Sequence, residues 1–303
     1  MKLKKLAKYL FKALPFALCA AILLAVAFYP QAEAAADATP RVVRVWNVDT
    51  FEGGKGSRTS FLKKAARAVE KEKDVYYLIS SYTAEGARSA LKEGVLPDVL
   101  SFVVGLSDFA ESGLSLPFTF AGGSMQGKTL AYPWCRGEYI LFSLCDDFAE
   151  EGTTVISNGG SNLTAVAAAY AGITGEERES LTAYVAFLNG EFRYLLGTQR
   201  DRCRFQTRGV QVYEKALNEY CDLFQYYSVL SSEKRDDALS LLEALLSEET
   251  QNALSDIGML PVGGTMPRRT VSVFSSEEAL ENAGRIARSG GDLKNLDKFL
   301  KTI

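Results

Sequence analysis

A tryptophan and two acidic residues stand close together where a short apolar segment of this chain gives way to glycines. Trp46, Asp49 and Glu52 lie within or just after the run 41–48, whose valines are typical of a buried strand. Glycines then interrupt the pattern, and Ser57 is suited to cap a following helix. In a strand–turn–helix unit, ligands bind at the carboxyl end of the strand. These side chains are therefore candidates for contact with a small molecule.

The composition excludes several kinds of catalysis. The chain has no histidine, which removes Ser–His–Asp and Cys–His sites together with the commonest metal ligand. The formal net charge is −3, so we expect no nucleic-acid partner. The four cysteines after residue 36 lack the spacing of a zinc site, and their pairing is left open among three arrangements. We expect no enzymatic activity, no catalytic residue, no cofactor and no metal ion.

Two short motifs match functional patterns only formally. Residues 122–129 fit GxxxxGK[ST], but Pro133 follows closely and the run continues as a strand, where a phosphate site needs a helix. Ser60 and Lys63 form an S-x-x-K pair, the one hydrolase dyad that needs no histidine. No K-T-G or S-D-N partner accompanies it. An extracellular Ser/Lys hydrolase is therefore kept only as an unfavoured alternative.

Residues 1–36 have the pattern of an export signal. Five lysines precede the apolar run 13–29, and small residues then supply A-x-A cleavage sites between Ala32 and Ala36. The 17 apolar residues of this run fall just short of the ~20 that span a bilayer. The segment is thus either a cleaved signal peptide or a retained membrane anchor. In both cases we expect the rest of the chain to be exported to the extracellular face of the membrane or the periplasm.

Strands and helices alternate in the exported part. A strand at 75–79, a helix between Thr83 and Gly94, and a strand within 95–104 complete a β-α-β-α-β order, which predicts a parallel sheet. Further extended segments are expected at 130–134, 139–142, 193–205 and 222–230, and helices at 162–170, 176–188, 233–246, from Glu248, and from Ser275 with Glu278 as its capping box. The roughly 265 residues are enough for two lobes, which would be interleaved because no linker divides them.

Several blocks in order along the chain carry a resemblance to a known family. They are the Trp-to-Gly-Gly segment 46–54, then 96–98, 127–134, 196–201, 221–226, and 248–251 leading to 257–262. This order resembles the extracellular solute-binding proteins of ABC transporters, family 1, carbohydrate type, with the type II periplasmic-binding-protein fold. The resemblance implies an α/β protein of two interleaved lobes with mostly parallel sheets joined by crossing strands. The expected lobes are 41–130 with 224–258, and 131–223 with 259–303, the second being reduced.

The resemblance also implies a ligand-binding set between the lobes. It consists of Trp46, Asp49, Glu52 and Gly53 on the first lip, Trp134 and Arg136 after the first crossing, and Gln199, Arg200 and Asp201 on the second lip. Sugars bind to aromatic faces and to planar hydrogen-bonding groups, which this set contains. Simpler roles stay open: tryptophans in the core, a stabilising ion pair between Arg200 and Asp201, and glycines that serve only the turn.

The expected function is that of a noncatalytic receptor. It would bind a small polar ligand, a sugar or oligosaccharide by resemblance, and deliver it to the transmembrane subunits of an ABC permease. Closure of the lobes about a hinge would trap the ligand. The alternative is a membrane-anchored surface sensor or adaptor on the same fold, since a fold does not fix a function. Membrane contact would then come through an uncleaved N-terminal segment.

Overall fold

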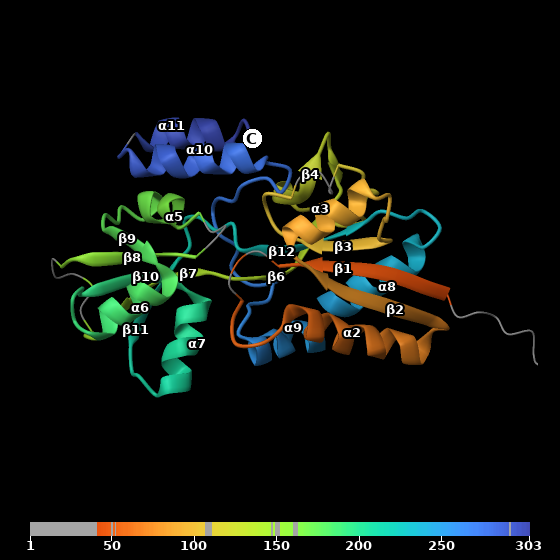
Figure 1. Cartoon of the computed structure of the whole chain (residues 1–303), viewed down its shortest axis with the longest axis horizontal. Coiled ribbons are helices and arrows are strands. Elements are labelled where there is room, and N and C mark those ends of the chain that lie inside the picture. Colours follow the sequence, from red (N-terminus) through yellow and green to blue (C-terminus); the bar gives the residue numbers. More distant parts are fainter. Residues whose placement is uncertain are drawn as a thin grey trace, which may run out of the picture. The chain divides into compact units, whose positions relative to one another are not determined.

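In the computed structural model, the described strands and helices belong to the unit Arg41–Ile303. The described residues are 41–49, 51, 53–106, 111–146, 148, 152–159, 163–290 and 292–303. The predicted export segment and Glu52 of the predicted site lie outside them. Two five-stranded sheets organise this unit, each with helices packed against it (Figure 1).

The first sheet confirms the predicted β-α-β-α-β order. Strand β1 (Arg41–Val48) pairs in parallel with β2 (Val75–Tyr82) on one side and β3 (Val99–Phe102) on the other. Two antiparallel strands, β12 (Phe224–Val229) and β6 (Tyr132–Arg136), extend the sheet to the order β2-β1-β3-β12-β6. Strand β6 therefore belongs to the first sheet, although the expected boundary put residues from 131 onward in the second lobe.

Helices cover the first sheet on both faces. Helix α2 (Arg58–Glu72) begins at the predicted cap, where the Ser57 side chain accepts a hydrogen bond from the Ser60 amide, and it packs against α8 (Arg235–Leu246). Helix α3 (Ala84–Lys92) lies on the opposite side of the sheet (Figure 1). The short helix α9 (Glu248–Ala253) and a 3₁₀ turn then lead out of the first sheet.

The second sheet has the order β11-β7-β10-β8-β9. Its strands are β7 (Tyr139–Ser143), β8 (Thr154–Asn158), β9 (Glu176–Glu179), β10 (Tyr194–Thr198) and β11 (Tyr213–Leu217). In each sheet two pairings are parallel and two antiparallel, so the α/β class is confirmed but the sheets are mixed rather than mostly parallel.

Helices α5 (Thr164–Tyr170), α6 (Ser180–Leu188) and α7 (Gln199–Arg208) pack around this sheet, and two predictions of their bounds were wrong. The helix expected from residue 176 starts four residues later, because β9 pairs with β8. The segment expected to be extended to residue 205 ends at Thr198. Thr198 and Asp201 form a capping box there and start α7.

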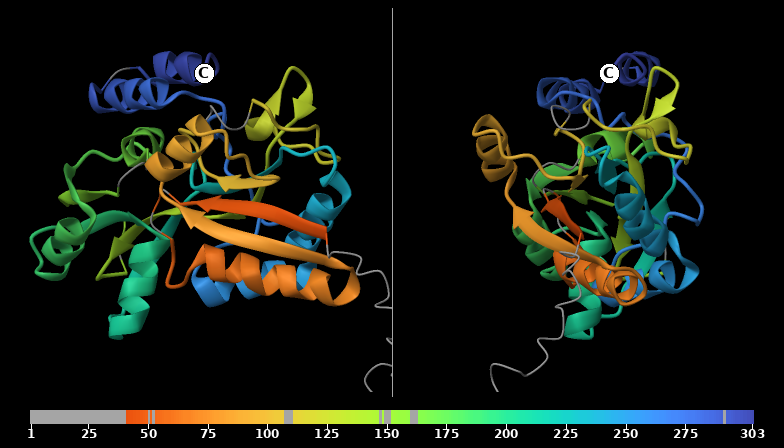
Figure 2. Two further views of the ribbon diagram at one scale, coloured as in Figure 1. Left: turned by 45° about the vertical axis from the view of Figure 1, so that its right-hand side comes forward. Right: turned by 90° about the vertical axis from the view of Figure 1, so that its right-hand side faces the viewer.

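The chain ends in two helices, α10 (Glu277–Arg288) and α11 (Leu293–Leu300). The N-terminal cap of α10 is Ser276, one residue after the predicted position, and its side chain accepts a hydrogen bond from the Ala279 amide. Helix α10 packs against α5, and both views of Figure 2 show α10 and α11 on one side of the unit. Among the helices of the described residues, none is long and apolar enough to cross a bilayer.

The fold shows the structure of the segment 122–129 and the state of the cysteines. The GxxxxGK[ST] match folds as a hairpin of β4 (Ser124–Met125) and β5 (Lys128–Thr129), without the helix that a phosphate site needs. The four cysteines of the unit are free; Cys135, Cys203 and Cys221 are buried, whereas Cys145 is exposed.

Candidate functional site

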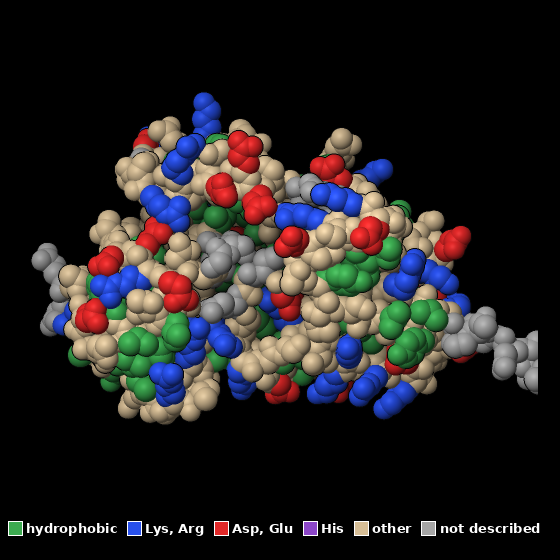
Figure 3. All heavy atoms as spheres, viewed as in Figure 1, with side chains coloured by type: hydrophobic (Ala, Val, Ile, Leu, Met, Phe, Trp, Pro, Cys, Tyr) green, Lys and Arg blue, Asp and Glu red, His purple; other side chains and the backbone are tan. Residues whose placement is uncertain are grey.

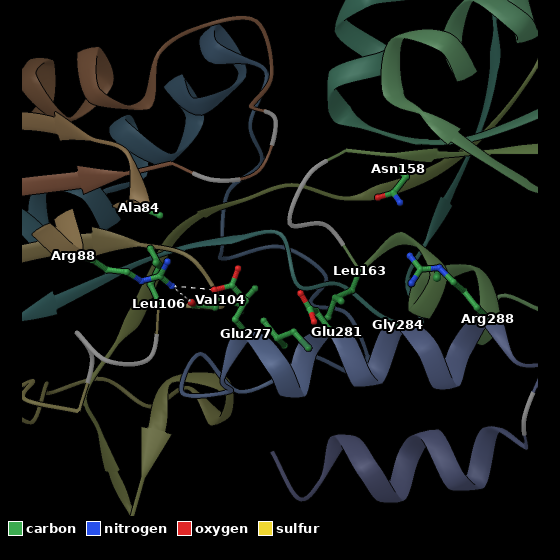
Figure 4. A pocket seen from close by; sticks show the side chains of 13 residues that line it. Ala84, Arg88, Val104, Leu106, Asn158, Leu163, Glu277, Glu281, Gly284 and Arg288 are labelled. Carbon is green, nitrogen blue, oxygen red and sulfur yellow. Dashed lines mark hydrogen bonds and ion pairs between the residues drawn. The ribbon is translucent and has the colours of Figure 1, made fainter. Parts of the chain in front are cut away.

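A cavity of about 340 Å³ lies where elements of both sheets meet. Gly105 and Leu106 line it a few residues after β3, and Asn158, the last residue of β8, lines it from the second sheet. Leu163 at the start of α5 completes this wall, while α3 and α10 supply the rest (Figure 4). The carboxyl ends of parallel strands on two sheets thus open onto one space, which is the usual place for a ligand in open α/β sheets.

Charged side chains of both signs line this cavity. The Arg88 guanidinium, from α3, donates through Nη2 to the Gly105 carbonyl oxygen (3.3 Å) and to Oε2 of Glu277 (3.2 Å). Glu281 lies one helical turn after Glu277 on α10, and its carboxylate points into the space (Figure 4). At the other end, Arg288 donates to Glu177 of β9 at 2.8 and 3.0 Å. In the space-filling view, acidic and basic side chains lie close together on the face near the C-terminal helices (Figure 3).

Apart from the Asn158 side chain, the remaining described lining is aliphatic. It consists of Ala84, Val104, Leu106, Leu163, Ala165 and Leu280, together with glycine backbone. Within the part of the chain that the structure describes, the cavity wall contains no aromatic ring. It can therefore hold an apolar group among the aliphatic side chains while polar groups meet the arginines and glutamates.

The predicted first lip is built as a supported loop. Asp49 Oδ1 accepts hydrogen bonds from Asn47 Nδ2 (2.9 Å) and takes part in an ion pair with Arg58 Nε (3.2 Å). Arg58 is almost fully buried, and its Nη2 donates to the Phe51 carbonyl oxygen (2.8 Å). Asp49 thus neutralises a buried arginine at the start of α2. Gly53, next in this loop, is partly exposed.

Neither tryptophan lines the 340 Å³ cavity, although Trp46 lines a separate cavity of about 490 Å³ beside Asp98. Trp134 is fully buried, stacks against Phe61 of α2 at a centroid distance of 5.9 Å, and donates from Nε1 to Ser101 Oγ (3.1 Å). Trp46 is 4% exposed and packs against Tyr82. Their environments match the alternative role of core packing, which the aromatic content of the chain left open.

Arg136 fastens the C-terminal segment to β6. Its Nε donates to the Pro261 carbonyl oxygen (3.1 Å) and its Nη2 to that of Thr265 (3.2 Å). Its backbone also pairs with that of Leu260 across an isolated antiparallel bridge. These contacts give the arginine a role in joining chain segments.

The predicted second lip forms the first turn of α7. Asp201 caps this helix by accepting the Thr198 amide (3.1 Å), and it pairs with Arg204 (2.9 Å) in an i,i+3 arrangement. The Gln199 side-chain oxygen accepts the Glu138 amide (3.0 Å). Arg200 reaches across to the first sheet and donates from Nη1 to the Gly54 carbonyl oxygen.

The structure therefore brings part of the predicted set together, but away from the cavity. The β1–α2 loop meets α7 through Arg200, and the Lys55 amide donates to the Ile257 carbonyl oxygen (2.9 Å). None of the predicted residues that are described lines the 340 Å³ cavity. Ser60 and Lys63, the S-x-x-K pair, are exposed on α2 and also lie outside it.

Sequence reasoning missed Arg88, Glu277 and Glu281. Arg88 follows the Thr83 cap by little more than one turn, and the two glutamates are spaced i,i+4 in the first turns of α10. Their local pattern is that of ordinary solvated helix positions. The sequence shows a positive residue near the start of α3 and negative residues near the start of α10. It does not indicate that these two helices face each other.

A buried carboxyl group lies between the sheets, behind the cavity. Asp222 Oδ1 accepts a hydrogen bond from the Tyr139 hydroxyl (2.8 Å), and Oδ2 accepts one from the Leu163 amide (3.3 Å). Burial raises the pKa of Asp222 to about 6, against the opposing effect of these hydrogen bonds. Asp222 thus connects the start of β7, the start of α5 and the segment that leads into β12.

Comparison with known proteins shows the fold. No protein-family model matches the chain, and no curated protein matches its sequence. Maltodextrin-binding protein MalE1 from L. casei has 13% identity and a TM-score of 0.56, covering 86% of this chain and 98% of its own. The maltose-maltodextrin-binding protein of Alicyclobacillus acidocaldarius has 12% identity and a TM-score of 0.55, covering 86% and 100%.

A third solved structure, iron-bound HitA from Pseudomonas aeruginosa, has 14% identity and a TM-score of 0.51, covering 87% of this chain and 99% of its own. These likenesses extend over nearly the whole length of each solved structure. They confirm that the chain has the type II periplasmic-binding-protein fold that the ordered sequence blocks predict.

Proposed function

We propose that this protein is an exported, noncatalytic receptor that binds a small polar solute and presents it to an ABC permease. The observation that carries the proposal is the cavity between the two sheets, at the carboxyl ends of β3 and β8. A space of about 340 Å³ lies at the lower end of the range for small-molecule sites. Its charged, amide and aliphatic lining suits binding, and the described lining residues contain no arrangement of nucleophile and base.

The solved structures with this fold are named for ligands of different chemical classes, so they do not define the ligand class of this chain. The solved structures described above are named for maltodextrins and for iron. A sugar or oligosaccharide is the ligand that the sequence resemblance predicts for this chain.

We retain the two-lobe division as part of the proposal, with the first boundary moved from residue 131 to Gly137, between β6 and β7.

Ligand binding can be tested by thermal unfolding of the purified chain against sugars, amino acids, short peptides and metal oxyanions. A ligand that binds only the folded state adds about 2.7 kcal/mol at a hundredfold excess over its dissociation constant, which raises the melting temperature by several degrees. We expect at least one compound class to produce such a shift.

Two substitutions in α3 test whether the compound that raises the melting temperature binds in the cavity. Ala84→Phe places a ring into the lining and should abolish the shift, whereas Ser89→Phe, at an exposed position of the same helix, should leave it intact. A shift that survives Ala84→Phe would place the ligand elsewhere. No shift with any compound would count against a receptor and favour the surface sensor or adaptor.

A further inference from the structure

We infer that the solute is a zwitterion, an α-amino acid or a short peptide, whose carboxylate binds Arg88 and whose ammonium group binds Glu281. This inference rests on the proposed function and names its ligand class. It differs from the sugar that the sequence resemblance predicts. Three properties of the cavity support it: an arginine with spare donors, an available carboxylate, and an aliphatic wall.

The first property is that Arg88 keeps hydrogen-bond donors for a ligand. A guanidinium has five N–H donors in a planar fork. The contacts of Arg88 with Gly105 and Glu277 both use Nη2, so within the described residues the N–H groups of Nε and Nη1 remain for hydrogen bonds to a ligand carboxylate. The Arg88 side chain is 35% exposed, and it lines the cavity, so a ligand can reach it.

The second property is the carboxylate of Glu281. It points into the cavity from α10 and, among the described residues, has no hydrogen bond or ion pair (Figure 4). Glu277, four residues earlier on the same face, already pairs with Arg88. The pair and the available carboxylate together place a positive and a negative group in one small space. A ligand ammonium group beside Glu281 would receive charge-assisted hydrogen bonds of the stronger kind.

The third property is the aliphatic wall. Leu106, Leu163 and Leu280 line the cavity, and the described lining has no ring on which a sugar face could stack. Aliphatic side chains favour an apolar group through burial, at roughly 25 cal/mol for each Å² removed from water. An amino acid with an aliphatic side chain matches all three properties through its carboxylate, its ammonium group and its side chain.

The test uses isothermal titration calorimetry of the purified chain with the twenty standard amino acids, L-leucyl-L-leucine and maltose. We expect one or more zwitterions to bind and maltose to show no binding. For the best zwitterion, the amide analogue lacks the carboxylate and the des-amino acid lacks the ammonium group. Each analogue should bind at least tenfold more weakly.

Matched variants assign the contacts. Glu281→Gln should weaken binding at least tenfold, while Glu278→Gln, on the same helix but outside the lining, should leave it unchanged. Arg88→Lys keeps the positive charge but removes the planar fork, and should also weaken binding. Melting temperatures of all variants show whether they fold.

The outcomes separate this inference from the proposed function. Maltose binding that Ala84→Phe abolishes, without binding of any zwitterion, would overturn the inference while leaving the receptor function standing. Zwitterion binding that is unaffected by both Glu281→Gln and Arg88→Lys would also overturn it. Absence of binding by every compound would count against both proposals.

Discussion

At the scale of single residues, Asp222 places a carboxyl group in the interior without an ion-pair partner among the described residues. It is 1% exposed and accepts hydrogen bonds from Tyr139 and Leu163. Tyr220 and Cys221 directly precede it in the chain, and burial raises the pKa of each of these groups as well. Neutral donors only partly replace water around an ionised carboxylate, so the folded state favours the protonated form.

The raised pKa of Asp222 predicts a pH-dependent stability of known sign. With a pKa of about 6 when folded, against 3.8 as the ordinary value, Asp222 binds its proton more tightly in the folded state. Its contribution is therefore most favourable at low pH and is lost as the pH rises through 6. From pH 4.5 to 7.5 we expect this residue to lower the free energy of unfolding by roughly 2 kcal/mol.

Urea unfolding of the wild type and of Asp222→Asn isolates this effect. All other titrating groups are common to the two proteins, so the difference between their free energies of unfolding reports Asp222 alone. The variant should gain stability relative to the wild type as the pH rises from 4.5 to 7.5. A difference that stays constant over this range would contradict the raised pKa.

Trp134 and Asp49 were predicted to contact a ligand, but in the folded chain each contacts a buried side chain. Trp134 was a candidate for ring stacking because its neighbours resemble a ligand-binding block, yet its ring fills the space between β6 and α2 beside Phe61. A single sequence does not indicate which face of β6 the helix covers. A single sequence also does not indicate that the Asp49 carboxylate forms an ion pair with the buried Arg58.

At the scale of elements, the β1–α2 loop packs through its backbone against the segment that follows α9, and it accepts a hydrogen bond from a side chain of α7. Gly54 lies against the backbone of Ile257 and Gly258, and its carbonyl oxygen accepts a hydrogen bond from Arg200 of α7. Gly258 itself has a φ of +68° and closes on Cys203. The glycines of this loop therefore serve close packing as well as the turn.

Gly54→Ala should disrupt this contact, with Gly53→Ala as its matched control. A Cβ on Gly54 would overlap the carbonyl oxygens of Ile257 and Gly258, so the loop must move and we expect a loss of about 1–3 kcal/mol of unfolding free energy. At Gly53 the nearest atom would be 3.8 Å away, and the change should be close to neutral. Chemical denaturation measures both; equal effects would show that the loop is not tightly packed.

Short-range signals predicted most elements correctly. The Ser57 and Thr83 caps and the glycine after α3 fall where the sequence indicates, because each depends on a few neighbouring residues. The helix α7 was missed although Thr198 and Asp201 form a capping box. Their box follows directly on a buried strand, and the apolar residues Cys203 and Phe205 extended the strand pattern beyond its true end.

At the scale of the whole unit from Arg41 to Ile303, helix α10 bridges elements of both sheets. Glu277 pairs with Arg88 on α3 at 3.2 Å, and Arg288 pairs with Glu177 on β9 at 2.8 Å. Such exposed pairs contribute at most about 1 kcal/mol each, so they orient the helix more than they stabilise it. The amphipathic pattern of α10 predicts a helix but not its docking position, and the cavity depends on that position.

The predicted export of the chain can be tested by labelling its cysteines, because the cysteines of this unit differ in exposure. Cys145 is exposed, whereas the other three described cysteines are buried. A membrane-impermeant maleimide applied to intact protoplasts should therefore label the exported protein at Cys145, and Cys145→Ser should abolish the label. Labelling only after lysis would place the chain inside the cell and would contradict an extracytoplasmic receptor. The mass of the labelled protein would also show whether the N-terminal 36 residues have been removed.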